Sequence, residues 1–108
     1  MPYYMLQNSG TREGWDAMMK LDLEKRVQYL TEMVEKLGGK VEGWWSAFGE
    51  YDWVLICQMP DNTSVAAFSL ALLSGGAVKA CKTTPLMTMK ETAVALQKAA
   101  ASGYQSPK

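Results

Sequence analysis

The chain has 108 residues, 48% hydrophobic and 20% charged, which is typical of one soluble globular domain. Eleven basic residues balance eleven acidic ones, so no global field favours nucleic acid or an anionic membrane as a partner. Histidine is absent, which removes the commonest zinc ligand and the commonest general base at neutral pH. No apolar run approaches the roughly 20 residues of a membrane span. The first residues do not resemble a signal peptide, so we expect a cytoplasmic protein.

Strand and helix patterns alternate along the chain. Between Leu23 and Leu37 the apolar residues recur every three or four positions, as on one face of a helix. We expect Asp22 to be the N-cap of that helix, and Gly38-Gly39 supplies its stop. Residues 11–19 are ambiguous between a helical turn and a loop. The predicted elements are strands at residues 3–8, 40–48, 51–59 and 77–84, helices at 22–37, from a cap at Asp61 or Asn62 to Gly75-Gly76, and from a Thr88 and Glu91 capping box to 101, and a frayed tail at 102–108.

The order strand, helix, strand, strand, helix, strand is that of a ferredoxin-like βαββαβ fold. We therefore expect one α+β domain over residues 1–108, with a four-stranded antiparallel sheet, two helices on one face and an extra C-terminal helix. The first and third strands would be central. Cys57 and Cys81 would then be separated by the first strand, which favours free thiols over a disulfide. The connection between the second and third strands, Gly49-Glu50, is short, and we therefore predict a tight antiparallel turn there.

Both faces of the third predicted strand are apolar. Val54 and Ile56 point to one side, whereas Trp53, Leu55 and Cys57 point to the other. Two helices can cover only one face, and a fully exposed apolar sheet would aggregate. We therefore predict a homodimer at least, with the two sheets packed face to face around a partly apolar cavity. The alternative is a monomer whose last helix folds back over the sheet.

An ordered set of motifs covers most of the chain. It comprises Gly38-Gly39-Lys40-Val41, Gly49-Glu50-Tyr51-Asp52, an apolar strand, Pro60-Asp61, an alanine-rich helix, glycines, Val78 and Thr83-Thr84. The set, over roughly residues 3–92, resembles the GYD-domain family of small bacterial and archaeal proteins, named for a glycine, tyrosine and aspartate signature. The resemblance implies a ferredoxin-like fold of the dimeric α/β-barrel kind. It implies no activity.

Several polar and aromatic side chains are candidates for a site. Glu50 and Asp52 could act as acid and base or bind a cation, although a carboxylate at a turn more often accepts backbone N–H bonds. Aromatic residues of the second and third strands, Trp44, Trp45, Tyr51 and Trp53, could form walls for a flat ligand or only stabilise the sheet. The candidate ligand-binding residues are Asn8, Trp44, Tyr51, Asp52, Trp53, Gln58, Lys82 and Thr84, and the structural signature is Gly49, Glu50, Tyr51 and Asp52.

These observations favour a protein that binds a small, partly apolar molecule in a pocket at the sheet face of a dimeric α/β barrel. An alternative, by analogy of fold alone, is an enzyme of the cofactor-independent monooxygenase or isomerase kind. A third hypothesis is a structural or regulatory oligomer without a ligand. We predict no metal, no cofactor, no nucleic-acid partner and no membrane partner, and the sequence identifies no catalytic residue.

Overall fold

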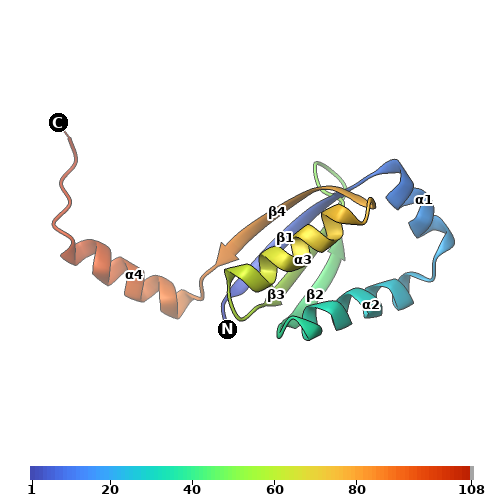
Figure 1. Ribbon diagram of the computed structural model, residues 1–108. Helices are drawn as coiled ribbons and strands as arrows, with labels where there is room; N and C mark the ends of the chain where they lie inside the picture. The colour runs from blue at the N-terminus through green and yellow to red at the C-terminus, as the bar shows by residue number, and fades with distance from the viewer. Residues whose placement is uncertain (108) are drawn as a thin grey trace.

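One four-stranded antiparallel sheet organises the computed structural model, which describes residues 1–107 (Figure 1). The strand order β2-β3-β1-β4 places β1 and β3 in the centre, as predicted. The fold is therefore α+β and ferredoxin-like. Of the predicted tail, residue 108 lies outside the described residues. The elements are β1 (Tyr3–Gly10), α1 (Arg12–Lys20), α2 (Leu23–Lys36), β2 (Lys40–Ser46), β3 (Trp53–Gln58), α3 (Asn62–Ser74), β4 (Val78–Leu86) and α4 (Met89–Ala101).

The core lies between one face of the sheet and helices α2 and α3. Side chains alternate along the two central strands, so every second residue of β1 and β3 faces these helices. Phe68 of α3 and Val34 of α2 meet them and are fully buried. In Figure 1, α3 lies over the sheet and α2 runs back beside β2. The buried residues of this cluster are Tyr4, Leu6, Val34, Leu55, Cys57, Met59, Val65 and Phe68.

The predicted ends of the second helix are confirmed by backbone geometry. Asp22 Oδ1 accepts hydrogen bonds from the N–H groups of Glu24 and Lys25, at 3.1 and 3.3 Å. At the other end, Gly38 N donates to the Glu35 carbonyl and Gly39 N to the Val34 carbonyl, the pattern of a Schellman motif. Gly38 has a φ of +88°, a conformation that favours glycine. The capping box that opens α4 is present as predicted.

The predicted tight return between β2 and β3 is wrong. β2 ends at Ser46 and β3 begins at Trp53, so residues 47–52 form a longer connection. Asp52 N donates to the Asn8 carbonyl at 2.8 Å, which ties the end of the connection to β1. Gly49 does not make a left-handed turn, because the positive-φ glycines of the described residues are Gly38, Gly76 and Gly103.

The ambiguous segment at residues 11–19 is helical. It forms α1, whose N-cap Thr11 accepts a hydrogen bond from Gly14 N at 3.0 Å. Gly14 of this helix is buried, and the cavity-facing side of the helix is formed by Gly14, Ala17 and Met18, a stripe too short for sequence periodicity to separate from a loop. Its position beyond the end of the sheet, with α2 returning from it toward β2, is visible in Figure 1.

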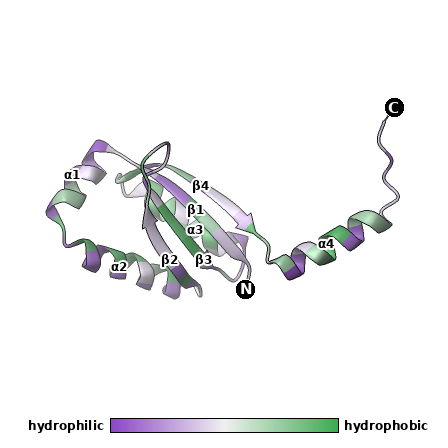
Figure 2. Cartoon of the chain, turned by 180° about the vertical axis from the view of Figure 1, so that it is seen from behind, coloured by the Kyte–Doolittle hydropathy of each residue, from purple (hydrophilic) through white to green (hydrophobic). Residues whose placement is uncertain are grey.

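Helix α4 does not fold back over the sheet, so the alternative in which the last helix covers the second face is wrong in that respect. None of its residues is buried, and it projects from the end of β4 away from the rest of the chain (Figures 1 and 2). The radius of gyration is 17.1 Å, whereas a compact chain of this length has about 13 Å. Figure 2 shows the second face of the sheet uncovered, with α3 behind it. Among residues 1–107, no helix has the length and apolar character needed to span a membrane.

Candidate functional site

A cavity of about 370 Å³ opens between the helix-covered face of the sheet and helices α1 and α2. It lies at one end of the sheet, where Asn8 near the end of β1, Ser46 at the end of β2 and Trp53 at the start of β3 meet. Most of its lining side chains are aliphatic or aromatic, including Leu30 of α2 and Leu72 of α3. Its volume falls within the range of about 300–1,000 Å³ found for small-molecule sites.

Asn8 lines this cavity and carries a buried polar atom without a partner in the described part of the chain. Tyr4, Leu6 and Asn8 are every second residue of β1, so all three face the helices. The hydroxyl of Tyr4 donates to Asn62 Oδ1 at 2.7 Å, and Leu6 packs in the core. Asn8 is only 3% exposed, yet its Oδ1 has no hydrogen-bond partner within residues 1–107. Leaving such a group buried and unpaired costs about 1–3 kcal/mol.

Two tryptophans form the walls beside Asn8. The indole N–H of Trp44 donates to Thr31 Oγ1 at 3.0 Å, and Thr31 in turn donates to the Val27 carbonyl at 2.8 Å, so α2 fixes the ring. Trp53, which is the β3 neighbour of Asn8, packs against Trp15 of α1 with ring centroids 4.8 Å apart. The cavity is therefore bounded by aromatic surfaces that other elements hold in place.

The beginning of α1 is anchored to the turn before β4. Thr11 N donates to the Ala77 carbonyl at 3.0 Å, and the Thr11 hydroxyl donates to the Gly76 carbonyl at 2.6 Å. A side chain at Gly14 would collide with the Ala77 backbone, so only glycine allows this approach. The anchor closes one end of the cavity, and the rest of α1 forms its outer wall.

The glycine, tyrosine and aspartate signature fastens the 47–52 connection to the end of β1. Asp52 Oδ2 accepts a hydrogen bond from Gly10 N at 2.9 Å, and the Ser9 hydroxyl donates to the Glu50 carbonyl at 3.0 Å. Asp52 thus accepts a backbone N–H bond, the structural role expected of a carboxylate at a turn. Glu50 is exposed, and the two carboxylates do not converge on a site.

The remaining candidate residues are divided between the two faces. Asn8, Trp44 and Trp53 line the cavity. Tyr51 and Asp52 do not line it and belong to the 47–52 connection between β2 and β3. Gln58, Lys82 and Thr84 lie on the uncovered face, since their strand positions alternate with those that face the helices. Gln58 there donates to Glu42 Oε1 at 2.7 Å.

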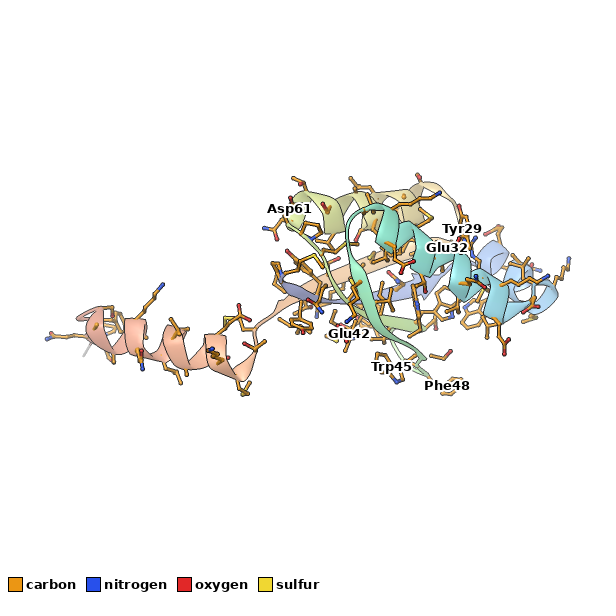
Figure 3. All side chains as sticks on the ribbon, turned by 90° about the horizontal axis from the view of Figure 1, so that it is seen from below. Tyr29, Glu32, Glu42, Trp45, Phe48 and Asp61 are labelled. Carbon is orange, nitrogen blue, oxygen red and sulfur yellow. The ribbon has the colours of Figure 1, made fainter. Side chains whose placement is uncertain are left out.

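The predicted cluster of four aromatic side chains does not form. Trp44 and Trp45 are consecutive in β2 and therefore point to opposite faces. Figure 3 shows Trp45 with Glu42 and Phe48 on the side of β2 away from the helices. The partner of Trp53 is instead Trp15, from the segment whose structure the sequence left open. No pattern in the sequence selected Arg26, which lines the cavity from α2.

Neither cysteine forms a disulfide, as predicted. Cys57 is fully buried and free, and burial raises the pKa of its thiol to about 11, which makes it a poor nucleophile. Cys81 is also free, and its sulfur lies 3.5 Å from the Ser69 hydroxyl oxygen. Within residues 1–107, no group of three or more Cys, Asp or Glu side chains is arranged to hold a metal ion.

The fold and the cavity define a small single-sheet α+β protein of the ferredoxin-like class. The family model of the GYD domain matches residues 4–96, which is most of the chain. The chain belongs to the GYD-domain family, and the family resemblance seen in the sequence is confirmed. A comparison of the sequence with curated proteins finds no match.

Solved structures share the fold at low sequence identity. The crystal structure of TTHA0845 from Thermus thermophilus has a TM-score of 0.51 at 20% identity, over 82% of this chain and 95% of that one. MtbAldR has a TM-score of 0.54 at 14% identity, over 81% of this chain and 53% of that one. An AsnC family transcriptional regulator from Agrobacterium tumefaciens has a TM-score of 0.50 at 14% identity, over 81% and 50%. The chain thus spans about half the length of these last two proteins, and the likeness is one of fold.

Proposed function

We propose that the protein binds a small, partly apolar molecule in the cavity beside Asn8. The observation that carries this proposal is the buried side chain of Asn8, which lines an apolar cavity and whose Oδ1 has no partner within the described residues. With the Asn8 amide turned toward the cavity, a bound molecule with an N–H or O–H group would satisfy this oxygen, while the apolar part of the molecule would lie against Trp44 and Trp53. The cavity so proposed lies on the helix-covered face, within one copy of the chain.

The lining side chains support binding over acid–base catalysis. They include no carboxylate, lysine, tyrosine or cysteine, and the one ionisable group is Arg26, which stays protonated in proteins. An enzyme of the monooxygenase or isomerase kind would need a group that holds or moves a proton at the substrate. Asp52, the carboxylate nearest in sequence to Trp53, is occupied by the Gly10 N–H.

A cavity-filling variant tests this proposal. Ala17 of α1 and Ala66 of α3 are both exposed helix residues, but Ala17 lines the cavity and Ala66 does not. The probe is phenylbutanol, a neutral molecule with an apolar body and a hydroxyl group, added to protein refolded from denaturant and therefore free of co-purified molecules. We expect binding to change tryptophan emission in the wild type and in Ala66→Phe, but not in Ala17→Phe. Equal binding by both variants, or none by the wild type, would contradict the proposal.

We also propose that two copies of the chain associate through the uncovered face of the sheet. This face carries apolar side chains of the central strands, Met5 of β1 with Val54 and Ile56 of β3. A sheet of four strands with about seven residues each measures roughly 19 by 23 Å, or about 440 Å². Each partner in a stable interface buries about 800 Å², so the sheet alone is too small.

Helix α4 supplies the additional surface in this proposal. Met89, Ala93 and Leu96 follow one another at steps of four and three, which places them on one side of the helix. Met89 is 80% and Leu96 is 66% exposed. A 13-residue helix without tertiary contacts is only marginally stable in water. Packing of this stripe against a second copy would both stabilise α4 and enlarge the interface.

A further inference from the structure

The side chains that line the cavity carry a net positive charge. Three polar side chains line it, namely Asn8 from β1, Arg26 from α2 and Ser46 from the end of β2. Arg26 carries a permanent positive charge, and no Asp or Glu is present in the lining to balance it. The cavity therefore combines an apolar interior with a single cation in its wall.

Arg26 lines the cavity beside the exposed ring of Tyr29, so its guanidinium lies toward the solvent side of α2, where an anion can reach it. Its side chain is half-buried, and its guanidinium lies over the ring of Tyr29, 5.2 Å from the ring centre. Stacking on a ring restricts the side chain while leaving the N–H groups at its edge free to donate. A guanidinium edge matches the two oxygens of a carboxylate, and an apolar wall strengthens that attraction because water screens it less.

We infer that the cavity selects an organic monoanion, namely a carboxylate attached to a flat or bulky apolar body. The carboxylate pairs with Arg26, and the apolar body lies against Trp44 and Trp53. A lining with one cation suits a single negative charge better than the higher charge of a phosphate ester. This inference rests on the proposed function, since it specifies the molecule that the same cavity binds.

Three probes with the same body and different head groups test the inference. Phenylbutyrate, phenylbutanol and phenylbutylamine are anionic, neutral and cationic at neutral pH, and each is titrated into refolded protein with calorimetry and tryptophan emission as readouts. We expect phenylbutyrate to bind about tenfold more tightly than phenylbutanol, equivalent to about 1.4 kcal/mol, and phenylbutylamine to bind most weakly. In Arg26→Gln the advantage of phenylbutyrate should fall to about twofold or less, with phenylbutanol unchanged.

Lys25→Gln is the matched control, because Lys25 is the exposed neighbour on the same helix and its loss changes the net charge equally. It should preserve the preference for phenylbutyrate. Equal binding of the acid and the alcohol, both abolished by Ala17→Phe, would overturn this inference and leave the proposed function standing. An equal loss of preference in Lys25→Gln would show a general charge effect and would also overturn it. Failure of all three probes to bind would overturn both.

Discussion

The unpaired oxygen of Asn8 makes an unusual prediction, that replacing a buried cavity residue will stabilise the protein. Leucine has the same number of side-chain heavy atoms as asparagine but no polar group to satisfy. Asn8→Leu removes a desolvation cost of about 1–3 kcal/mol and suits a buried strand position better. We expect the free energy of unfolding to rise by about 1–2 kcal/mol, and each kcal/mol to raise the Tm by about 4–8 °C.

Urea unfolding of refolded protein, followed by circular dichroism at one fixed protein concentration, measures this change. Tyr4→Phe is the control, because it removes a hydroxyl whose hydrogen bond to Asn62 is satisfied. That variant should lose about 0.5–1.5 kcal/mol. The same Asn8→Leu protein should bind phenylbutanol about fivefold more weakly, since the hydrogen bond to the ligand is lost. An Asn8→Leu protein that is about 1 kcal/mol less stable than the wild type would refute the reasoning.

Three further predictions concern the signature, the uncovered face and the buried thiol. Asp52→Ala should lower the free energy of unfolding in urea by about 1–3 kcal/mol, because the buried Gly10 N–H loses its acceptor. Asp52→Asn keeps an acceptor oxygen and should lower it less. Equal losses of stability in the two variants would contradict this account. Ile56→Lys places an ammonium group on the uncovered face of the sheet. Light scattering after size exclusion should show this variant as a monomer, whereas the exposed control Ala66→Lys should remain a dimer. A dimeric Ile56→Lys protein would contradict the proposed interface. Because burial raises the pKa of Cys57 from 9.0 to about 11, its contribution to stability is fully present below pH 9.0 and is lost as the pH rises toward about 11. The loss is at most about 2–3 kcal/mol, and a Cys57→Ala protein with the same decline would contradict this account.

The sequence predicts those parts of the fold that depend on local patterns. The apolar period from Leu23 to Leu37, the cap at Asp22 and the glycines after it place α2 correctly, because each signal acts within a few residues. The connection between β2 and β3 could not be predicted in the same way. Its course depends on two hydrogen bonds, one that Asp52 N donates to the Asn8 carbonyl and one that Asp52 Oδ2 accepts from Gly10 N, and both partners are more than forty residues away, where no local pattern reveals them.

The candidate site was predictable only in part. Asn8 and the two cavity tryptophans attract notice as a polar residue in an apolar strand and as aromatic residues. Gln58 and Thr84 are likewise polar residues in apolar strands, but strand alternation places these two on the other face. Arg26 resembles any charged residue of a solvated helix, and only the position of α1 turns its surroundings into a cavity wall.

The central claim is that the cavity beside Asn8 is the binding site, and nuclear magnetic resonance tests it most directly. Phenylbutanol is titrated into isotopically labelled protein while the Asn8 side-chain amide, the Trp44 and Trp53 indole N–H groups and the methyl groups of the uncovered face are followed. The account predicts shifts of the amide and both indole signals, with the methyl signals of Met5 and Ile56 unchanged. Shifts confined to those methyl groups, with the Asn8 amide unmoved, would contradict it and place binding on the opposite face of the sheet.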